Sequence, residues 1–143
     1  MFFGRFNHSL DDKGRLVIPS KMRDQFSRLI YIMKGYDGAL AIYKEQEFLK
    51  LVEQAEKLDF NKKNTRFYLR SQLASTCELE LDKQGRVQIP TQLLNQYKIG
   101  KDVIIIGVGD HIEVWDKAIY EKYENEANEN FEEIAENLKK DDE

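Results

Sequence analysis

A phrase of eleven residues occurs twice in this chain, at positions 10–20 and 81–91, and limits its architecture more than any other feature. The first copy reads LDDKGRLVIPS and the second reads LDKQGRVQIPT. From Asp11 to Asp82 and from Arg15 to Arg86 is 71 positions in both cases, so the copies align without a gap. An internal repeat of this kind has to be interpreted before any other pattern. It predicts two similar structural halves.

Each copy of the phrase lies in the same predicted order of elements: strand, turn, strand, helix, strand, turn, strand. Asp and Gly favour the first tight turn, because Asp bonds nearby backbone amides and Gly accepts a positive φ. The apolar run after the Arg predicts a strand, and the following Pro ends it because Pro has no N–H for a ladder. Ser20 and Thr91 are predicted to cap short helices. The other strands are expected at 1–9, 31–33, 39–43, 76–81, 103–106 and 111–115.

Helices are expected between the halves and after them. Residues 45–58 place apolar side chains on one face of a helix, and a second helix is predicted over 65–73. Asp116 is expected to cap a long last helix, whose apolar stripe runs to Leu138, with a frayed end over 139–143. This stripe could pack on its own domain or on a neighbouring subunit.

Charge is distributed unevenly along the chain. The formal net charge is −4, yet residues 116–143 carry 4 Lys and 11 acidic residues, and residues 1–115 carry three more basic than acidic residues. Local charge decides whether a surface can approach phosphates, so the body remains compatible with nucleic acid. A single cysteine, the lack of an apolar run of membrane-spanning length and the lack of a signal peptide predict a cytoplasmic protein without a membrane partner.

Neither half is expected to fold alone. A unit of roughly 40 residues buries little apolar surface and needs another chain or a staple. The simplest solution is that the two halves interleave around one core. The two Asp-containing turns would then lie in related positions across a pseudo-twofold axis. This arrangement suits a protein that recognises twofold or repeated DNA sites.

The duplicated phrase, the Pro that ends its strand and the opening Met1-Phe2-Phe3-Gly4 resemble the MraZ family over nearly the whole chain. The resemblance implies an α+β, mainly β fold. Two intertwined swapped-hairpin repeats of the AbrB/SpoVT type would form a single small barrel, with helices between the repeats and a C-terminal helix. The expected divisions are repeat 1 over 5–47, a helical connection over 48–75, repeat 2 over 76–119 and an acidic helix and tail over 120–143.

The same resemblance implies a function. Members of this family are bacterial transcription regulators of the division and cell-wall gene cluster, associated with the nucleoid. The resemblance therefore implies a ring-shaped homo-oligomer that binds short repeated promoter boxes in double-stranded DNA.

The resemblance assigns DNA contact to four basic residues of the phrases, Lys13, Arg15, Lys83 and Arg86. Arg suits this role because its planar guanidinium forks onto a guanine edge or a phosphate, whereas Lys acts as a point charge. The two lysines do not occupy equivalent positions, so the second copy matches the family less closely. The residues expected to support the two turns are Asp11, Gly14, Asp82 and Gly85. Those that could extend the basic face are Arg5, Lys21 and Arg23.

The Asp of each phrase has two candidate roles. It could bond the amides of the turn, or it could hold the Arg four positions further on. The habit of Asp in turns favours the first role. A plainer alternative is that Asp and Arg form only a structural ion pair, of a kind that contributes about 0–1 kcal/mol on a surface.

Two other classes of function are open. An enzyme is not expected, because the two His and one Cys lie far apart and no phosphate loop, nucleophile elbow or metal-spaced cluster occurs. No catalytic residue, metal, cofactor or small-molecule substrate is therefore predicted. The third class is an antitoxin-like or scaffold module that binds another protein through the same fold, and an acidic tail would suit it.

Overall fold

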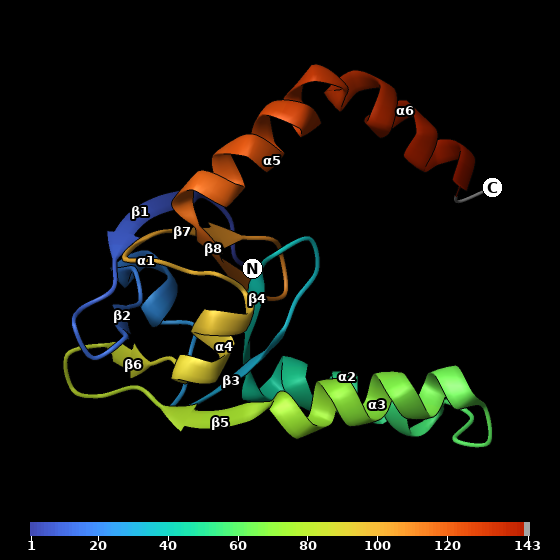
Figure 1. Ribbon diagram of the computed structural model, residues 1–143, viewed down its shortest axis with the longest axis horizontal. Coiled ribbons are helices and arrows are strands. Elements are labelled where there is room, and N and C mark those ends of the chain that lie inside the picture. The colour runs from blue at the N-terminus through green and yellow to red at the C-terminus, as the bar shows by residue number, and fades with distance from the viewer. Residues whose placement is uncertain (142–143) are drawn as a thin grey trace.

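The structure is a computed structural model that describes residues 1–141; the last two residues of the predicted frayed end, 142 and 143, lie outside the described part. The first repeat supplies β1 (Arg5–Ser9), β2 (Arg15–Val17), α1 (Ser20–Arg23), β3 (Leu29–Lys34) and β4 (Leu40–Lys44). The second supplies β5 (Cys77–Glu80), β6 (Arg86–Gln88), α4 (Thr91–Gln96), β7 (Asp102–Gly107) and β8 (Ile112–Asp116). The connecting helices are α2 (Glu45–Glu56) and α3 (Lys63–Ser75), and the last helices are α5 (Lys117–Glu129) and α6 (Phe131–Asp141) (Figure 1).

The strands pair antiparallel, and most pairs join one repeat to the other. The large sheet has the order β1-β7-β8-β4-β3-β5, so β1 lies beside β7 of the second repeat and β5 lies beside β3 of the first. β2 and β6 form a separate two-stranded sheet, which we call the ribbon. The predicted α+β fold of two interleaved swapped-hairpin repeats is confirmed. A single small barrel was expected; the large sheet keeps β1 and β5 as edges, so the barrel is not closed.

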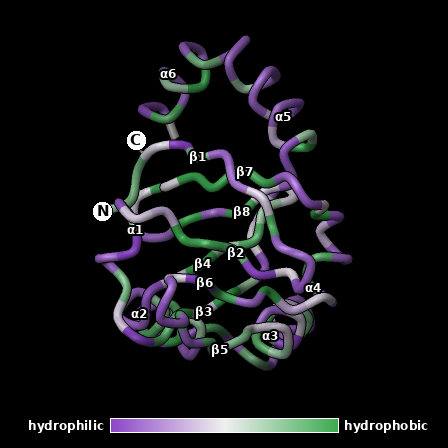
Figure 2. Tube along the Cα trace, turned by 90° about the vertical axis from the view of Figure 1, so that its left-hand side faces the viewer, coloured by the Kyte–Doolittle hydropathy of each residue, from purple (hydrophilic) through white to green (hydrophobic). Residues whose placement is uncertain are grey.

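One apolar cluster joins the two repeats. It takes side chains from alternate positions of the central strands, such as Ile105 and Ile112, and includes Leu16 and Val87 of the ribbon. Successive side chains of a strand point to opposite faces, which explains the alternation. Complete burial of such a side chain contributes about 1.5–3 kcal/mol. Figure 2 shows the hydrophobic residues concentrated in the strands in the middle of the molecule and in parts of the helices.

The prediction that Ser20 and Thr91 cap the short helices is wrong. The N-cap positions are Pro19 and Pro90, and neither α1 nor α4 has a side-chain cap. Each Pro already has the extended ψ of a cap residue, 137° and 133°. The Pro19 carbonyl accepts two N–H groups of α1, both at 2.9 Å, so the helix begins one residue earlier than the side-chain pattern indicated.

The long last helix predicted from the apolar stripe is two helices. α5 ends at Glu129. Its C-cap residue, Asn130, has φ −118° and ψ 15°, and the side-chain amide of Asn130 donates to the Glu126 carbonyl at 3.3 Å. Asn interrupts helices in this way because its side chain competes for backbone hydrogen bonds. The predicted cap at Asp116 is confirmed, since its carboxylate accepts the N–H of Ile119 at 3.3 Å.

Candidate nucleic-acid interface

The ribbon places the two arginines of the repeated phrase on one surface. Leu16 pairs with Val87 at the centre of its register, and both side chains are buried. The residues on either side of them face outward, because side chains alternate along a strand. Arg15 and Arg86 are therefore outward-facing diagonal neighbours, a relationship that separates Cα atoms by about 7–8 Å. A pseudo-twofold axis between Leu16 and Val87 relates them.

In the first turn, the Asp11 carboxylate fills both of the roles left open by the sequence. Its Oδ1 accepts the N–H groups of Lys13 at 2.9 Å and Arg15 at 2.8 Å, which holds the turn. Its Oδ2 accepts Nε–H of Arg15 at 2.5 Å. The Gly14 N–H closes the turn on the Asp11 carbonyl at 3.0 Å, with a φ of +76° that favours glycine. One side chain thus shapes the turn and orients the guanidinium.

The second turn has the same geometry, although its sequence matches less closely. Oδ1 of Asp82 accepts the N–H groups of Gln84 and Arg86, both at 2.8 Å. Oδ2 accepts Nε–H of Arg86 at 2.8 Å. The Gly85 N–H donates to the Asp82 carbonyl at 3.0 Å, and φ of Gly85 is +73°. Lys83, which is not equivalent in position to Lys13, takes no part in these bonds.

Each guanidinium is anchored through Nε alone. The Arg15 and Arg86 side chains are 30% and 27% exposed, and within residues 1–141 their Nη atoms have no hydrogen-bond partner. The Nη atoms supply the paired N–H groups with which Arg forks onto a phosphate or onto O6 and N7 of guanine. Anchored Nε and open Nη atoms form a preoriented contact for an anion or a base edge.

The backbone N–H of the arginine, and then its guanidinium, hold the pKa of each Asp below the ordinary value. This applies to Asp11 beside Arg15 and to Asp82 beside Arg86. Both carboxylates are therefore ionised at neutral pH. Each neutralises part of the charge of the arginine that it orients.

The turns also lock the two repeats together. The Ile18 N–H donates to the Gly85 carbonyl at 3.0 Å, and the Ile89 N–H donates to the Gly14 carbonyl at 3.1 Å. Arg23 supports the first of these contacts, because its guanidinium donates to the Ile18 carbonyl at 2.9 Å. Its Nε lies so close to Gly85 that a Cβ there would be 2.2 Å away. The half-buried Arg23 side chain thus supports the second turn.

The structure gathers some of the basic residues named from sequence and separates others. Lys13 and Lys83 are exposed on the two turns, next to the outer face of the ribbon. Lys21 is exposed on α1. Arg5 lies on β1 and pairs with Glu124 of α5 at 2.6 Å, so it fastens the helix to the sheet. The ribbon and its turns therefore carry the four residues expected to contact DNA.

Gln88 belongs to the outer face of the ribbon, and the sequence reasoning did not single it out. It is exposed, lies opposite Arg15 and donates from Nε2 to the Lys13 carbonyl at 3.2 Å. Strand alternation could have found it, because Gln88 follows Arg86 by two positions. It ties the first turn to the second strand of the ribbon.

Within residues 1–141, no cluster of three or more His, Cys, Asp or Glu side chains is placed to bind a metal ion. None of the helices in this part of the chain is long and apolar enough to cross a membrane.

Comparison with known proteins agrees with the duplicated architecture. The MraZ protein family, whose description also carries the words antitoxin-like, matches the chain over residues 1–71 and 73–142. A protein of Mesoplasma florum named transcriptional regulator MraZ is 44% identical over 139 residues, which cover 96% of this chain and 95% of the relative. Proteins of the same name from Pediococcus pentosaceus and Lactobacillus helveticus are 43% and 41% identical, with 96% of both chains covered. The chain therefore belongs to the MraZ family of transcriptional regulators.

Proposed function

We propose that this protein binds double-stranded DNA through the outer face of the ribbon, with Arg15 and Arg86 as the principal contacts. The observation that supports this most directly is the anchoring of each guanidinium by an Asp carboxylate, with the Nη atoms left open. The major groove, about 12 Å wide, admits a two-stranded ribbon. Lys13 and Lys83, on the flanking turns, would contact backbone phosphates as point charges.

A single ribbon would bind weakly. Its phrases carry four cations against three acidic residues, Asp11, Asp12 and Asp82, so the excess positive charge is small. Linking several subunits raises the local concentration of ribbons, and avidity can exceed one-site affinity by about 10²–10⁴. We therefore propose a ring-shaped homo-oligomer that binds short repeated boxes upstream of the division and cell-wall gene cluster, in the nucleoid.

The direct test is a band-shift titration of the upstream region of the protein's own gene with wild type and Arg15→Ala. The variant should lose the shifted complex while light scattering still shows the wild-type assembly. Lys117→Ala, which removes an exposed cation of α5 outside the ribbon, is the matched control and should bind normally. Arg15→Lys keeps the charge without the fork, so it should recover only a minor part of the affinity.

Wild-type-like binding by Arg15→Ala would show that Arg15 of the ribbon does not contact the DNA, which would contradict the proposal. If the wild-type protein itself failed to shift this DNA and instead captured another protein, the result would favour a protein-binding module. Equal losses in Arg15→Ala and Lys117→Ala would indicate a general effect of charge and would contradict a contact at the ribbon.

A further inference from the structure

The outer face of the ribbon is symmetric in its two arginines and asymmetric in its other two residues. Gln88 follows Val17 by 71 positions, so the two occupy equivalent places in the repeat. Gln88 lies opposite Arg15 in the register, and Val17 lies opposite Arg86. The Val side chain has no polar atom, whereas the Gln amide carries an acceptor oxygen and two N–H donors. The pseudo-twofold axis that relates the arginines therefore relates an apolar side chain to a polar one.

The side-chain amide of Gln88 is anchored by one hydrogen bond and keeps the rest of its bonding capacity. Its Nε2 donates to the Lys13 carbonyl at 3.2 Å. Because a carbonyl can only accept, this bond fixes which end of the amide is the nitrogen. Among the residues that the structure describes, Oε1 has no partner, and one N–H of Nε2 stays unused. The exposed Gln88 thus resembles Arg15, since each side chain is held at one group and open at others.

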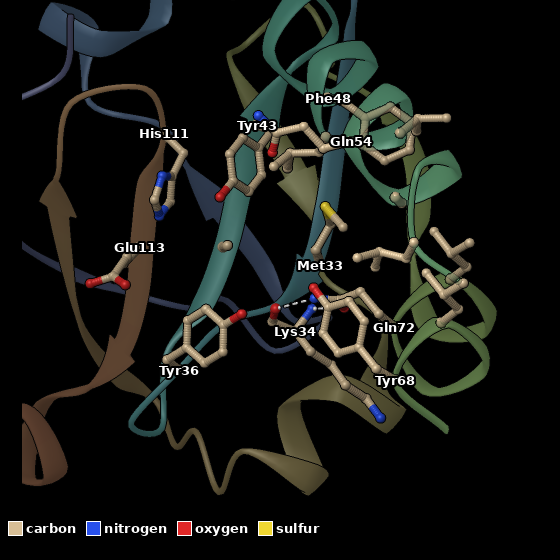
Figure 3. Close-up of a pocket in the computed structure, with 18 residues that line it drawn as sticks. Met33, Lys34, Tyr36, Tyr43, Phe48, Gln54, Tyr68, Gln72, His111 and Glu113 are labelled. Carbon is tan, nitrogen blue, oxygen red and sulfur yellow. Dashed lines mark hydrogen bonds between the residues drawn. The ribbon is translucent and has the colours of Figure 1, made fainter. Parts of the chain in front are cut away.

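Gln72 shows how a glutamine that only ties the backbone is bonded in the same protein. It lines a cavity of about 380 Å³ between the α2–α3 pair and strands β3 and β4 (Figure 3). Its Oε1 accepts the N–H of Lys34 at 3.1 Å, and its Nε2 donates to the Lys34 carbonyl at 2.8 Å. Both ends of that amide are used within the subunit. The open Oε1 of Gln88 is, by contrast, available to a ligand.

A free acceptor beside a free donor matches the major-groove edge of adenine. Adenine presents its N6 amino group as a donor and N7 as an acceptor, and a Gln amide bonds both at once. On Gln88, Oε1 would accept from N6, and the remaining N–H of Nε2 would donate to N7. Val17 offers neither bond, and an apolar side chain suits only the methyl group of thymine.

The register indicates where this adenine would lie. Side chains directly opposite in an antiparallel pair have Cβ atoms about 4.5–5.5 Å apart, and Arg15 and Gln88 are such a pair. Successive bases of a strand are about 3.4 Å apart along the duplex, so these two side chains can reach neighbouring base pairs. We propose that Gln88 contacts an adenine in the base pair next to the one that Arg15 contacts. The inference rests on the proposed DNA contact of the ribbon and adds a specificity-determining residue to it.

A base analogue tests the contact. A duplex from the upstream region that the wild type shifts would be resynthesised with 7-deazaadenine, which lacks the N7 acceptor, at one adenine position of every box at a time. At one position, the wild type should bind about threefold to tenfold more weakly, because half of a bidentate contact is lost. Gln88→Ala should bind the unmodified duplex about tenfold more weakly and should be insensitive to the analogue at that position.

Two further variants complete the test. Gln92→Ala removes an exposed glutamine of α4, outside the ribbon, and should keep both the affinity and the analogue sensitivity of the wild type. Val17→Gln places an amide opposite Arg86 and should become sensitive to the analogue at a second position. Because all three substituted side chains are exposed, circular dichroism should show an unchanged fold.

The outcomes separate this contact from the proposed function. If Arg15→Ala abolishes the shift while Gln88→Ala keeps the analogue profile of the wild type, the ribbon stands and the adenine contact is overturned. An equal loss by Gln88→Ala on every duplex would mean that Gln88 only ties the turn, which also overturns it. A wild type that does not shift the upstream region would overturn the proposed function, and the adenine contact with it.

Discussion

Asp11 holds Arg15 at two points, the backbone N–H at 2.8 Å through Oδ1 and the guanidinium Nε at 2.5 Å through Oδ2. The conformation of the turn and the direction of the guanidinium therefore depend on one carboxylate. An isolated surface ion pair would have no such link to the backbone. The pair Asp82 and Arg86 repeats this arrangement, with both distances 2.8 Å, so the same contacts occur in both halves of the protein.

We expect Asp11→Asn and Asp11→Ala to differ. The amide oxygen of Asn can still accept the turn N–H groups, but its NH₂ would face the Nε–H of Arg15, so the guanidinium loses its anchor. Asp11→Asn should keep a melting temperature near that of wild type and bind the promoter boxes about tenfold more weakly. Asp11→Ala should lose affinity and also melt at a lower temperature. Circular dichroism melting and band-shift titration measure the two effects.

Asp12→Asn is the control for this pair. Asp12 is an exposed neighbour in the same turn, and its substitution changes the net charge by the same amount. It should leave the melting temperature unchanged and should not weaken binding. A similar loss in Asp12→Asn and Asp11→Asn would mean that the orientation of Arg15 is irrelevant.

The pH dependence of stability follows from the same carboxylates. Backbone N–H groups hold the pKa of Asp11 and Asp82 below the ordinary value of 3.8 in the folded protein. A carboxyl whose pKa is lower in the folded state stabilises the fold above its unfolded pKa and loses this contribution as pH falls through the folded pKa. Thermal unfolding should therefore show a midpoint that falls as the pH is lowered below about 4.

The double variant Asp11→Asn and Asp82→Asn isolates this contribution. Its melting temperature should depend less steeply on pH in the acidic range, because the two groups no longer titrate. Other carboxyls will still contribute a slope, so the comparison is the difference between the two curves. Parallel curves of melting temperature against pH would show that Asp11 and Asp82 do not contribute to the pH dependence of stability.

The repeat made much of the fold predictable. Identity at a fixed separation indicated two equal halves, and the small size of each half required a shared core, which the pairing of Leu16 with Val87 confirms. The turn chemistry of Asp and Gly was also readable, because it depends on residues close in sequence. The double role of Asp11 was not predictable, since sequence spacing alone cannot show where the second carboxylate oxygen points.

Several features could not be predicted from the spacing of apolar and charged residues. The apolar stripe ran through Asn130 without interruption, and only the backbone geometry reveals that α6 is separate from α5. Arg23 looked like an accessory cation, whereas its hydrogen bond to the Ile18 carbonyl and its position against Gly85 of the second turn give it a structural role. Helix periodicity identified the apolar residues of α6 correctly. It did not tell a face that packs on its own domain from one that is left exposed.

Salt should separate the roles of the lysines and the arginines. A phosphate contact releases counterions, so the affinity of the wild type for DNA should fall steeply as ionic strength rises. Lys13→Ala should weaken binding to cognate and scrambled DNA equally. It should also make the plot of log affinity against log salt concentration shallower, by about one unit of slope for the lost phosphate contact. Arg15→Ala should mainly reduce the difference between the two DNAs. Fluorescence anisotropy at several salt concentrations provides both slopes, and identical behaviour of the two variants would contradict the assignment.

Neighbouring residues of β2 should respond very differently to truncation. Leu16 is completely buried beneath the ribbon, so Leu16→Ala should reduce the free energy of unfolding by about 2–5 kcal/mol. Val17 faces outward and is 36% exposed, and Val17→Ala should change stability by about 0.5 kcal/mol or less. Urea unfolding of the two variants tests the inward and outward faces of the ribbon. Similar losses would contradict this register.

The two phrase glycines should differ in their tolerance of a side chain. Both have a positive φ, and an L-residue there costs about 1–2 kcal/mol. At Gly14 the nearest atom to an added Cβ is a Leu94 methyl at 3.3 Å, which can move aside. At Gly85 the Cβ would lie 2.2 Å from Nε of Arg23 and would displace the guanidinium from the Ile18 carbonyl. Gly85→Ala should therefore be the more destabilising change in urea unfolding.

A double-mutant cycle tests the reason for this difference. Arg23→Ala alone should destabilise the protein, because the Ile18 carbonyl loses its donor. Once Arg23 is gone, the added methyl at position 85 no longer clashes with its side chain, whereas the cost of the positive φ remains. The double variant should then be more stable than the sum of the single effects predicts. Strict additivity would show that Arg23 and Gly85 do not interact and that the strain at Gly85 comes from its backbone alone.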